Sequence, residues 1–173
     1  MNDILDHIDK ASEAGLYYVS LFSVLAVPDI CGALEVTDGC ATKTLYEGWF
    51  DKWVAPGYRS GPVGQQQSLS GADCYHFRCR LLHQGSALTP KAPMANRFFF
   101  IEPGNSRIRM HNNRMNGAFN IDVGIFCKDM TNAARRWLIA VAGDATYLEN
   151  AANSIRRHPN GLSPFVQGVP VIG

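Results

Sequence analysis

The sequence predicts a mainly α-helical fold, a helical bundle with a small antiparallel β-hairpin inserted at about residues 97–111. Apolar residues recur at helical spacing in several segments, whereas the alternation typical of paired strands occurs around residues 97–111. The chain has 173 residues, of which 46% are hydrophobic, and this is enough to bury one core. We therefore expect residues 1–173 to form a single domain, with an extended C-terminal tail at 158–173.

Four helical patterns are found in the first part of the chain. They cover residues 1–15, 16–27, 28–36 and 44–54. Gly15 ends the first, residues 16–27 are apolar enough to be a buried helix, and Pro28 suits the first turn of the third. In the fourth, Thr44 and Glu47 have the spacing of a capping box.

A fifth helix is predicted at residues 70–84, and the functional interpretation depends on it. Ser70 and Asp73 are spaced as a capping pair at its start. Gly85 follows its last residue, where glycine commonly ends a helix because it adopts the left-handed conformation at no steric cost.

The second half of the chain begins with the predicted strands. Residues 97–102 and 107–111 flank the turn PGNS, and alternation places Arg107, Arg109 and His111 on one face. Further elements follow in order. They are a third strand at 118–123, a long helix at 124–143, a shorter helix at 144–157 and the extended tail. The long helix has an apolar stripe made of Phe126, Met130, Ala134, Trp137 and Val141.

Charge is unevenly distributed along a chain whose net charge is only +1. Residues 1–73 carry ten acidic side chains against four basic ones, whereas residues 74–120 carry seven basic side chains and one acidic. A basic segment of this kind binds phosphate-rich partners, or it pairs with acidic residues elsewhere in the chain. The sequence alone leaves both interpretations open.

Several classes of protein are disfavoured by what the sequence lacks. No P-loop, dinucleotide-binding glycine pattern or GxSxG motif is present, so we expect no cofactor. The N-terminus has no basic region typical of a secretory signal, and the longest apolar run, about 12 residues, is too short to span a membrane. The five cysteines include no CxxC pair. We therefore expect a reduced, cytoplasmic protein with no membrane contact.

Two arginines lie on the predicted helix at 70–84, in different surroundings. On a helical wheel Arg78 falls between two groups of apolar residues, whereas Arg80 lies on the solvated side. An arginine on a packed surface needs a partner, because an unpaired buried charge costs several kcal/mol. We expect this partner to be Asp73, a carboxylate from the first third of the chain, or a bound phosphate.

His83 stands near the end of the same helix and is a candidate acid/base group. The helix dipole there favours its protonated form by about 0.3–1 kcal/mol, so it serves either as a capping histidine or in proton transfer. Arg78 and His83 are five residues apart, about 140° around a regular helix. One helix is therefore not expected to bring them together without unwinding at its end or contact with a second copy.

A zinc site is an alternative use of this helix. His76, Cys79 and His83 share one face at i, i+3 and i+7, and His111 is a candidate fourth ligand. No zinc-finger spacing supports this interpretation, and a polar helix face explains the same pattern. We therefore expect no metal.

The segment RCRLLH, residues 78–83 within YHFRCRLLHQG, resembles the active-site signature of the HEPN family of compact helical domains, many of which cleave RNA. The resemblance implies a homodimer in which the arginines and histidines of both copies line a cleft. It also implies metal-independent cleavage by attack of the 2′-hydroxyl, giving a 2′,3′-cyclic phosphate. Arg78 would hold the phosphate and His83 would assist proton transfer, so both are the candidate catalytic residues.

RNA is the partner that this resemblance and the basic segment indicate together. The candidate RNA-binding residues are Arg80, Arg107, Arg109, His111 and Arg114. A toxin or defence role would fit such an endonuclease. The alternative is a helical module of the same fold that binds RNA or protein without catalysis. Cys79 favours this alternative, because family members commonly carry a polar residue directly after the arginine.

Overall fold

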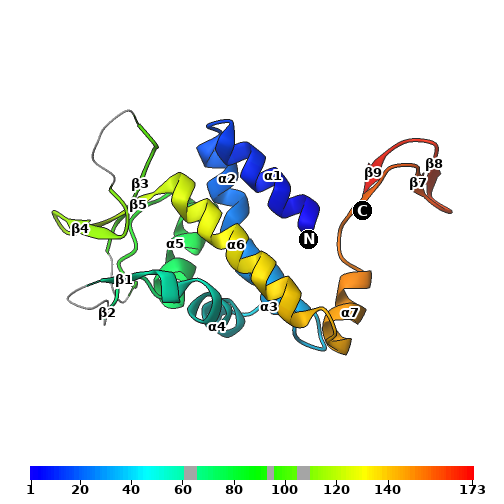
Figure 1. Cartoon of the computed structure of the whole chain (residues 1–173), viewed down its shortest axis with the longest axis horizontal. Helices are drawn as coiled ribbons and strands as arrows, with labels where there is room; N and C mark the ends of the chain where they lie inside the picture. Colours follow the sequence, from blue (N-terminus) through cyan, green and yellow to red (C-terminus); the bar gives the residue numbers. More distant parts are fainter. Residues whose placement is uncertain (61–65, 93–95, 105–109) are drawn as a thin grey trace.

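The computed structural model describes residues 1–60, 66–92, 96–104 and 110–173. The protein is mainly helical, as predicted (Figure 1). The helices are α1 (Asn2–Glu13), α2 (Tyr17–Val24), α3 (Val27–Leu34), α4 (Lys43–Trp53), the short 3-10 helix η1 (Ala55–Gly57), α5 (Gly71–Gln84), α6 (Val123–Val141) and α7 (Ala145–Ala152). The strands are β1 (Arg59–Ser60), β2 (Gln66–Gln67), β3 (Phe98–Ile101), β4 (Asn113–Met115), β5 (Ala118–Asp122), β6 (Arg157–His158), β7 (Gly161–Leu162), β8 (Val166–Gln167) and β9 (Val171–Ile172).

Helix α6 runs through the middle of the helical body, with α1 and α2 on one side and α4 on the other (Figure 1). The predicted apolar stripe accounts for this position. Phe126, Met130, Ala134 and Trp137 are buried in the core, and Val141 packs half-buried at its edge. The stripe of α6 is therefore the surface around which the other helices assemble.

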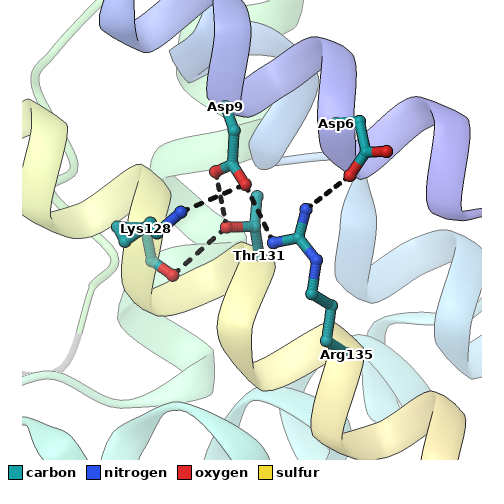
Figure 2. A network of polar contacts seen from close by, with 5 residues as sticks. All are labelled: Asp6, Asp9, Lys128, Thr131 and Arg135. Carbon is teal, nitrogen blue, oxygen red and sulfur yellow. Dashed lines mark hydrogen bonds and ion pairs between the residues drawn. The ribbon is translucent and has the colours of Figure 1, made fainter.

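A polar network joins α1 to α6 beside this apolar contact (Figure 2). The Thr131 hydroxyl donates to Asp9 Oδ1 at 2.8 Å, and Arg135 reaches Asp9 Oδ2 at 2.9 Å. Arg135 also contacts Asp6 at 2.8 Å, and Lys128 contacts Asp9 at 3.3 Å. Two acids of the acidic first third are thus paired with α6 and not with the basic segment 74–120.

The main sheet has the strand order β3-β5-β4. Strand β5 is central and buried along its whole length; β3 lies parallel to it, with Phe98 opposite Phe119, and β4 lies antiparallel. Strand β5 pairs along both of its edges, although two of its five residues are polar and the edge strand β3 is the more apolar of the two. The predicted strands at 97–102 and 118–123 are therefore present.

The predicted antiparallel hairpin at 97–111 is not confirmed. The partner of β3 is β5, in parallel, and the antiparallel pair in this sheet is β4 with β5. Residues 105–109, which include most of the predicted second strand and both Arg107 and Arg109, lie outside the described residues.

Two local expectations in the first half of the chain need correction. The residue that caps α4 is Thr42, not Thr44, because Thr42 has an extended backbone and its hydroxyl accepts from the Leu45 N–H at 3.2 Å. Helix α2 is only partly buried, since Tyr18 and Phe22 are exposed beside buried Leu21.

The stretch Tyr17–Leu34, which covers α2 and α3, is the one part of the described chain that is long and apolar enough to cross a membrane by length and composition. Half of it is buried against the rest of the protein. The core helices of soluble proteins and signal sequences near an N-terminus have the same character, so this stretch is weak evidence for a membrane span.

The chain beyond α7 forms an arm that leaves the helical body (Figure 1). It contains two short antiparallel ladders, β6 with β9 and β7 with β8, in the region predicted to be an extended tail. Near its base, Ile155 and Ile172 line a cavity with Met1 and Ile4 of the N-terminal helix.

The Asp9 network gives a first prediction about stability. Burial raises the pKa of the Asp9 carboxyl, but hydrogen bonds from Thr131, Arg135 and Lys128 outweigh it, so the pKa lies below its ordinary value of 3.8. The resulting stabilisation is fully present above the ordinary pKa and is lost as the pH falls through the lowered one. Asp9→Ala should therefore lower the free energy of unfolding by about 1–3 kcal/mol at neutral pH, and by less in acid, as measured by urea denaturation.

The matched control is Glu13→Ala, which removes an exposed carboxylate from the last residue of the same helix. Its effect should stay within about 0.5 kcal/mol. A loss at Asp9→Ala that is the same at neutral and acidic pH would show that the ionised network is not what stabilises the contact of α1 with α6.

Candidate functional site

Helix α5 carries the candidate site, and both of its ends are fixed as predicted. At the start, the Ser70 hydroxyl accepts from the Asp73 N–H at 3.1 Å, and the Asp73 carboxylate accepts from the Ser70 N–H at 3.0 Å. At the end, Gly85 adopts the left-handed conformation with φ 60°. Each cap satisfies backbone groups that the helix itself leaves without partners.

A close backbone approach sets the position of α5 on α4. A Cβ atom placed on Gly71 would lie 2.3 Å from the Glu47 carbonyl oxygen, so no residue with a side chain fits without displacing one helix. The Asp51 carboxylate accepts from the Gly71 N–H at 2.7 Å and holds the two helices at this point.

The inner face of α5 is packed against the sheet and against α4. Phe77 lies with its ring centroid 5.0 Å from both Phe98 and Phe100 of β3. One turn earlier, the Cys74 sulfur lies 3.3 Å from the Tyr46 hydroxyl of α4. Burial raises the pKa of the Cys74 thiol to about 12, so this cysteine is a packing residue and not a thiolate nucleophile.

Arg78 is paired with a carboxylate from the acidic first third, one of the expected partners. Its Nη2 lies 2.8 Å from Oδ2 of Asp29 on α3, and the two side chains are 23% and 16% exposed. Asp73, another expected partner, serves instead in the cap of α5. Asp29 on the neighbouring helix α3 thus holds the guanidinium of Arg78, and part of the arginine side chain stays exposed to solvent.

The protonation of this pair follows from its burial. Burial raises the pKa of the Asp29 carboxyl more than the nearby Arg78 lowers it. Burial lowers the pKa of Arg78, but the interactions with Asp29 and Cys79 together outweigh this and raise it. The guanidinium is charged in every case, because arginine does not lose its proton in proteins. The pair is therefore a fixed cation held by a carboxylate whose ionisation is made harder by burial.

Arg78 and His83 meet on one helix, contrary to the expectation that a regular helix keeps them apart. Arg78 Nη1 lies 3.3 Å from His83 Nε2, and the same Nη1 is 3.9 Å from the sulfur of Cys79. The 140° separation applies to the directions of the Cα–Cβ bonds, whereas the long arginine side chain reaches around the helix past Cys79.

The contact also defines the tautomer of the histidine. A guanidinium can only donate hydrogen bonds, so His83 Nε2 accepts and the ring carries its proton on Nδ1. The lone pair on Nε2, which a general base would need, therefore points at the guanidinium of Arg78. The Arg78 Nε–H is buried and makes no hydrogen bond within the described residues.

The other candidate RNA-binding residues are spread over the molecule. Arg80 lies on α5 and donates from Nε to the Leu88 carbonyl at 3.1 Å. His111 packs its ring against Tyr58 at 5.4 Å, and Arg114 lies over the Phe119 ring of the sheet at 5.5 Å. The contacts shown are thus with Tyr58, which follows η1, and with the sheet, and not with Arg78 or His83.

The zinc interpretation finds no support in the described part of the chain, which contains no cluster of three or more metal-ligating side chains. His83 turns its Nε2 toward Arg78 and not toward a shared centre with His76 and Cys79.

Asp29 is the residue of the site that sequence reasoning did not single out. It precedes Arg78 by many positions, and only the general excess of acids in residues 1–73 pointed toward such a partner.

A double-mutant cycle measures the strength of the Arg78–Asp29 pair. Because both side chains are mostly buried, Asp29→Asn and Arg78→Gln should couple by about 1–2 kcal/mol in the free energy of unfolding. The control is the pair Lys43–Glu47 on α4, 3.6 Å apart with Lys43 exposed, which should couple by about 0.3–0.5 kcal/mol. Equal coupling in the two cycles would mean that Asp29 does not fix the guanidinium.

Comparisons with known proteins found no match that could guide the interpretation of this geometry. The chain matches no protein-family model, no curated protein and no solved structure. The resemblance to the HEPN signature therefore rests on the pattern of residues 78–83 alone.

Proposed function

We propose that the protein is a metal-independent RNA endonuclease of the HEPN type, in which Arg78 and His83 act on one phosphodiester. The observation that carries the proposal is the 3.3 Å contact between Arg78 Nη1 and His83 Nε2 on the partly exposed side of α5. A phosphate-binding group and a proton acceptor stand side by side, and Asp29 holds the first of them in place.

Arg78 would bind the scissile phosphate. Its guanidinium retains hydrogen atoms that are not directed at Asp29 or His83, and a planar fork of donors matches two phosphate oxygens. As the 2′-oxygen approaches phosphorus, negative charge grows on those oxygens, and a fixed cation stabilises this charge more than it stabilises the bound substrate. The Asp29 contact contributes by removing the conformational freedom of the long side chain before RNA binds.

His83 would accept the proton of the attacking hydroxyl. When phosphate oxygens take over the hydrogen bonds of Arg78, Nε2 of His83 is released from the guanidinium and its lone pair becomes available. The bond from O2′ to phosphorus forms, the bond from phosphorus to the next O5′ breaks, and the leaving oxygen takes up a proton. The products are a 2′,3′-cyclic phosphate and a 5′-hydroxyl, and neither metal nor water is consumed.

The basic segment would bind the RNA on either side of the scissile bond. Arg80, Arg107, Arg109, His111 and Arg114 are the proposed contacts. The pairing of Asp6 and Asp9 with α6 supports this role, since these two acids do not neutralise the segment, in which Asp29 pairs with Arg78. A cytoplasmic toxin or defence component is the setting that such an activity would suit.

The alternative is a module of the same fold that binds RNA or protein without cleaving. One observation favours it: Asp29 and His83 together engage both terminal nitrogens of Arg78. A guanidinium satisfied in this way can be a structural link between α3 and α5. The outcome of the His83 substitution separates the two functions.

His83→Ala should lower the rate of RNA cleavage about 10²–10⁴-fold, the range expected for loss of a general acid/base. Cleavage of labelled single-stranded RNA should continue in EDTA, and a 2′-deoxy substrate should stay intact. His7→Ala, which removes an exposed histidine on α1, should cleave like the parent. If the parent leaves several RNAs intact, or if His83→Ala matches it, the binding module replaces the nuclease.

The resemblance also implies a homodimer with α5 near the two-fold axis, and we propose that the exposed apolar face of α2, which contacts α5, belongs to the interface. Tyr18 and Val19 are 76% and 56% exposed beside the pocket formed by Leu21 and Phe100, and a dimer interface would bury such side chains. Light scattering at tens of micromolar protein should give twice the mass of the chain, because a stable homodimer interface is large enough to survive dilution. Val19→Asp should halve the measured mass. Ile139→Asp, an exposed position on α6, should not. A monomeric parent contradicts the homodimer.

A further inference from the structure

A cavity of about 190 Å³ lies beside the candidate site, on the flank of α5 next to Cys79. Helix α5 forms one wall with His76, Cys79, Arg80 and Gln84, and the segment after the helix forms the other with Thr89 and Lys91. Cys79 lines this cavity and also contacts the candidate site, because its sulfur lies 3.9 Å from Nη1 of Arg78. Gln84 directly follows His83. The cavity therefore adjoins the Arg78–His83 contact.

The lining of this cavity is basic and rich in hydrogen-bond donors. Arg80 and Lys91 carry positive charge, His76 adds an imidazole and Gln84 an amide, and none of the described lining residues is acidic. A cluster of cations without a carboxylate raises the local potential, since nothing in it neutralises the charge. Its complement is an anion.

Arg80 is oriented for such a ligand. Its Nε–H is used by the Leu88 carbonyl at 3.1 Å, which fixes the guanidinium against the segment that also carries Lys91. The terminal nitrogens Nη1 and Nη2 of Arg80 have no hydrogen bond or ion pair to any residue that the structure describes. They remain available in a planar arrangement that suits phosphate oxygens.

We infer that this cavity is a subsite for the phosphate of the nucleotide next to the scissile one, held by Arg80 and Lys91. The inference rests on the proposed function, because it assumes that RNA lies across α5. The volume supports a single phosphate group, since it is below the roughly 300–1,000 Å³ of pockets that enclose larger organic ligands. With Arg78 on one side of Cys79 and Arg80 on the other, two successive phosphates would cross α5 at that residue.

Binding of an RNA that cannot be cleaved tests the subsite separately from catalysis. The probe is a fluorescein-labelled single strand of about ten 2′-O-methyl nucleotides, which lacks the attacking hydroxyl, and fluorescence anisotropy is followed at several salt concentrations. Lys91→Ala should weaken Kd about 3–10-fold and should reduce the slope of log K against log salt by about 0.7, the value for one phosphate contact on a single strand.

Two further variants test whether the loss of affinity is specific to the residues that line the cavity. Arg80→Gln should weaken binding to a similar degree, and its amide can keep the contact with the Leu88 carbonyl, so the thermal midpoint of unfolding should match the parent. Lys10→Ala removes an exposed cation from α1 and should leave both Kd and the salt slope unchanged.

The possible outcomes separate the subsite from the nuclease. If Lys91→Ala and Arg80→Gln bind the probe with the parental Kd and slope, the subsite is wrong, whatever RNA cleavage shows. The subsite is equally wrong if the parent does not bind the probe. If both variants lose affinity but the parent cleaves no RNA, Arg80 and Lys91 hold an RNA phosphate in the binding module, and the nuclease proposal fails.

Discussion

The backbone of α5 begins in direct contact with the backbone of α4, and the rest of the candidate site depends on this approach. At Gly71 there is no room for a side chain against the Glu47 carbonyl, and Asp51 holds the Gly71 N–H. The contact fixes where α5 starts and how it is rotated. That rotation turns Phe77 toward the sheet and leaves Arg78 facing α3, where Asp29 lies.

The Arg78–Asp29 pair balances two opposing effects. Taking both side chains largely out of water costs free energy, and their attraction offsets this cost only when the geometry is good. The raised pKa of Asp29 shows that burial remains the larger influence on the carboxyl. Such a pair adds little net stability, whereas the loss of one partner leaves the other charge without compensation. Its contribution is to give Arg78 one orientation, and a site that binds phosphate benefits from a cation already in position.

Local features of the fold were predictable from sequence, because they depend on residues close together in the chain. The Ser70–Asp73 cap and the left-handed Gly85 are examples, as is the stripe of α6. The capping residue of α4 was misplaced by two positions, because Glu47 gave Thr44 the spacing of a capping box, whereas Thr42 caps the helix with its hydroxyl alone. The parallel pairing of β3 with β5 was not foreseen, because strand partners are chosen by burial in three dimensions.

In the candidate site, too, only the features that depend on residues close together in the chain were predicted. Sequence reasoning identified Arg78 and His83 and required a partner for the arginine. It could not name Asp29, which the packing of α3 brings to α5. The convergence of Arg78 with His83 was also missed, because a helical wheel gives the direction in which a side chain leaves the helix and takes no account of its length. For lysine and arginine, reach matters as much as direction.

The junction between β5 and α6 is a point at which the chain cannot gain or lose a residue without disturbing the fold. Asp122 is both the last residue of β5 and the capping residue of α6, where its carboxylate accepts from the Ile125 N–H at 2.9 Å. No loop separates the strand from the helix, so an inserted residue has nowhere to be absorbed. One extra residue would turn α6 by about 100° relative to the sheet and move its apolar stripe away from α1, α2 and α4. Insertions and deletions should therefore be tolerated in the connections between other elements and excluded at this point.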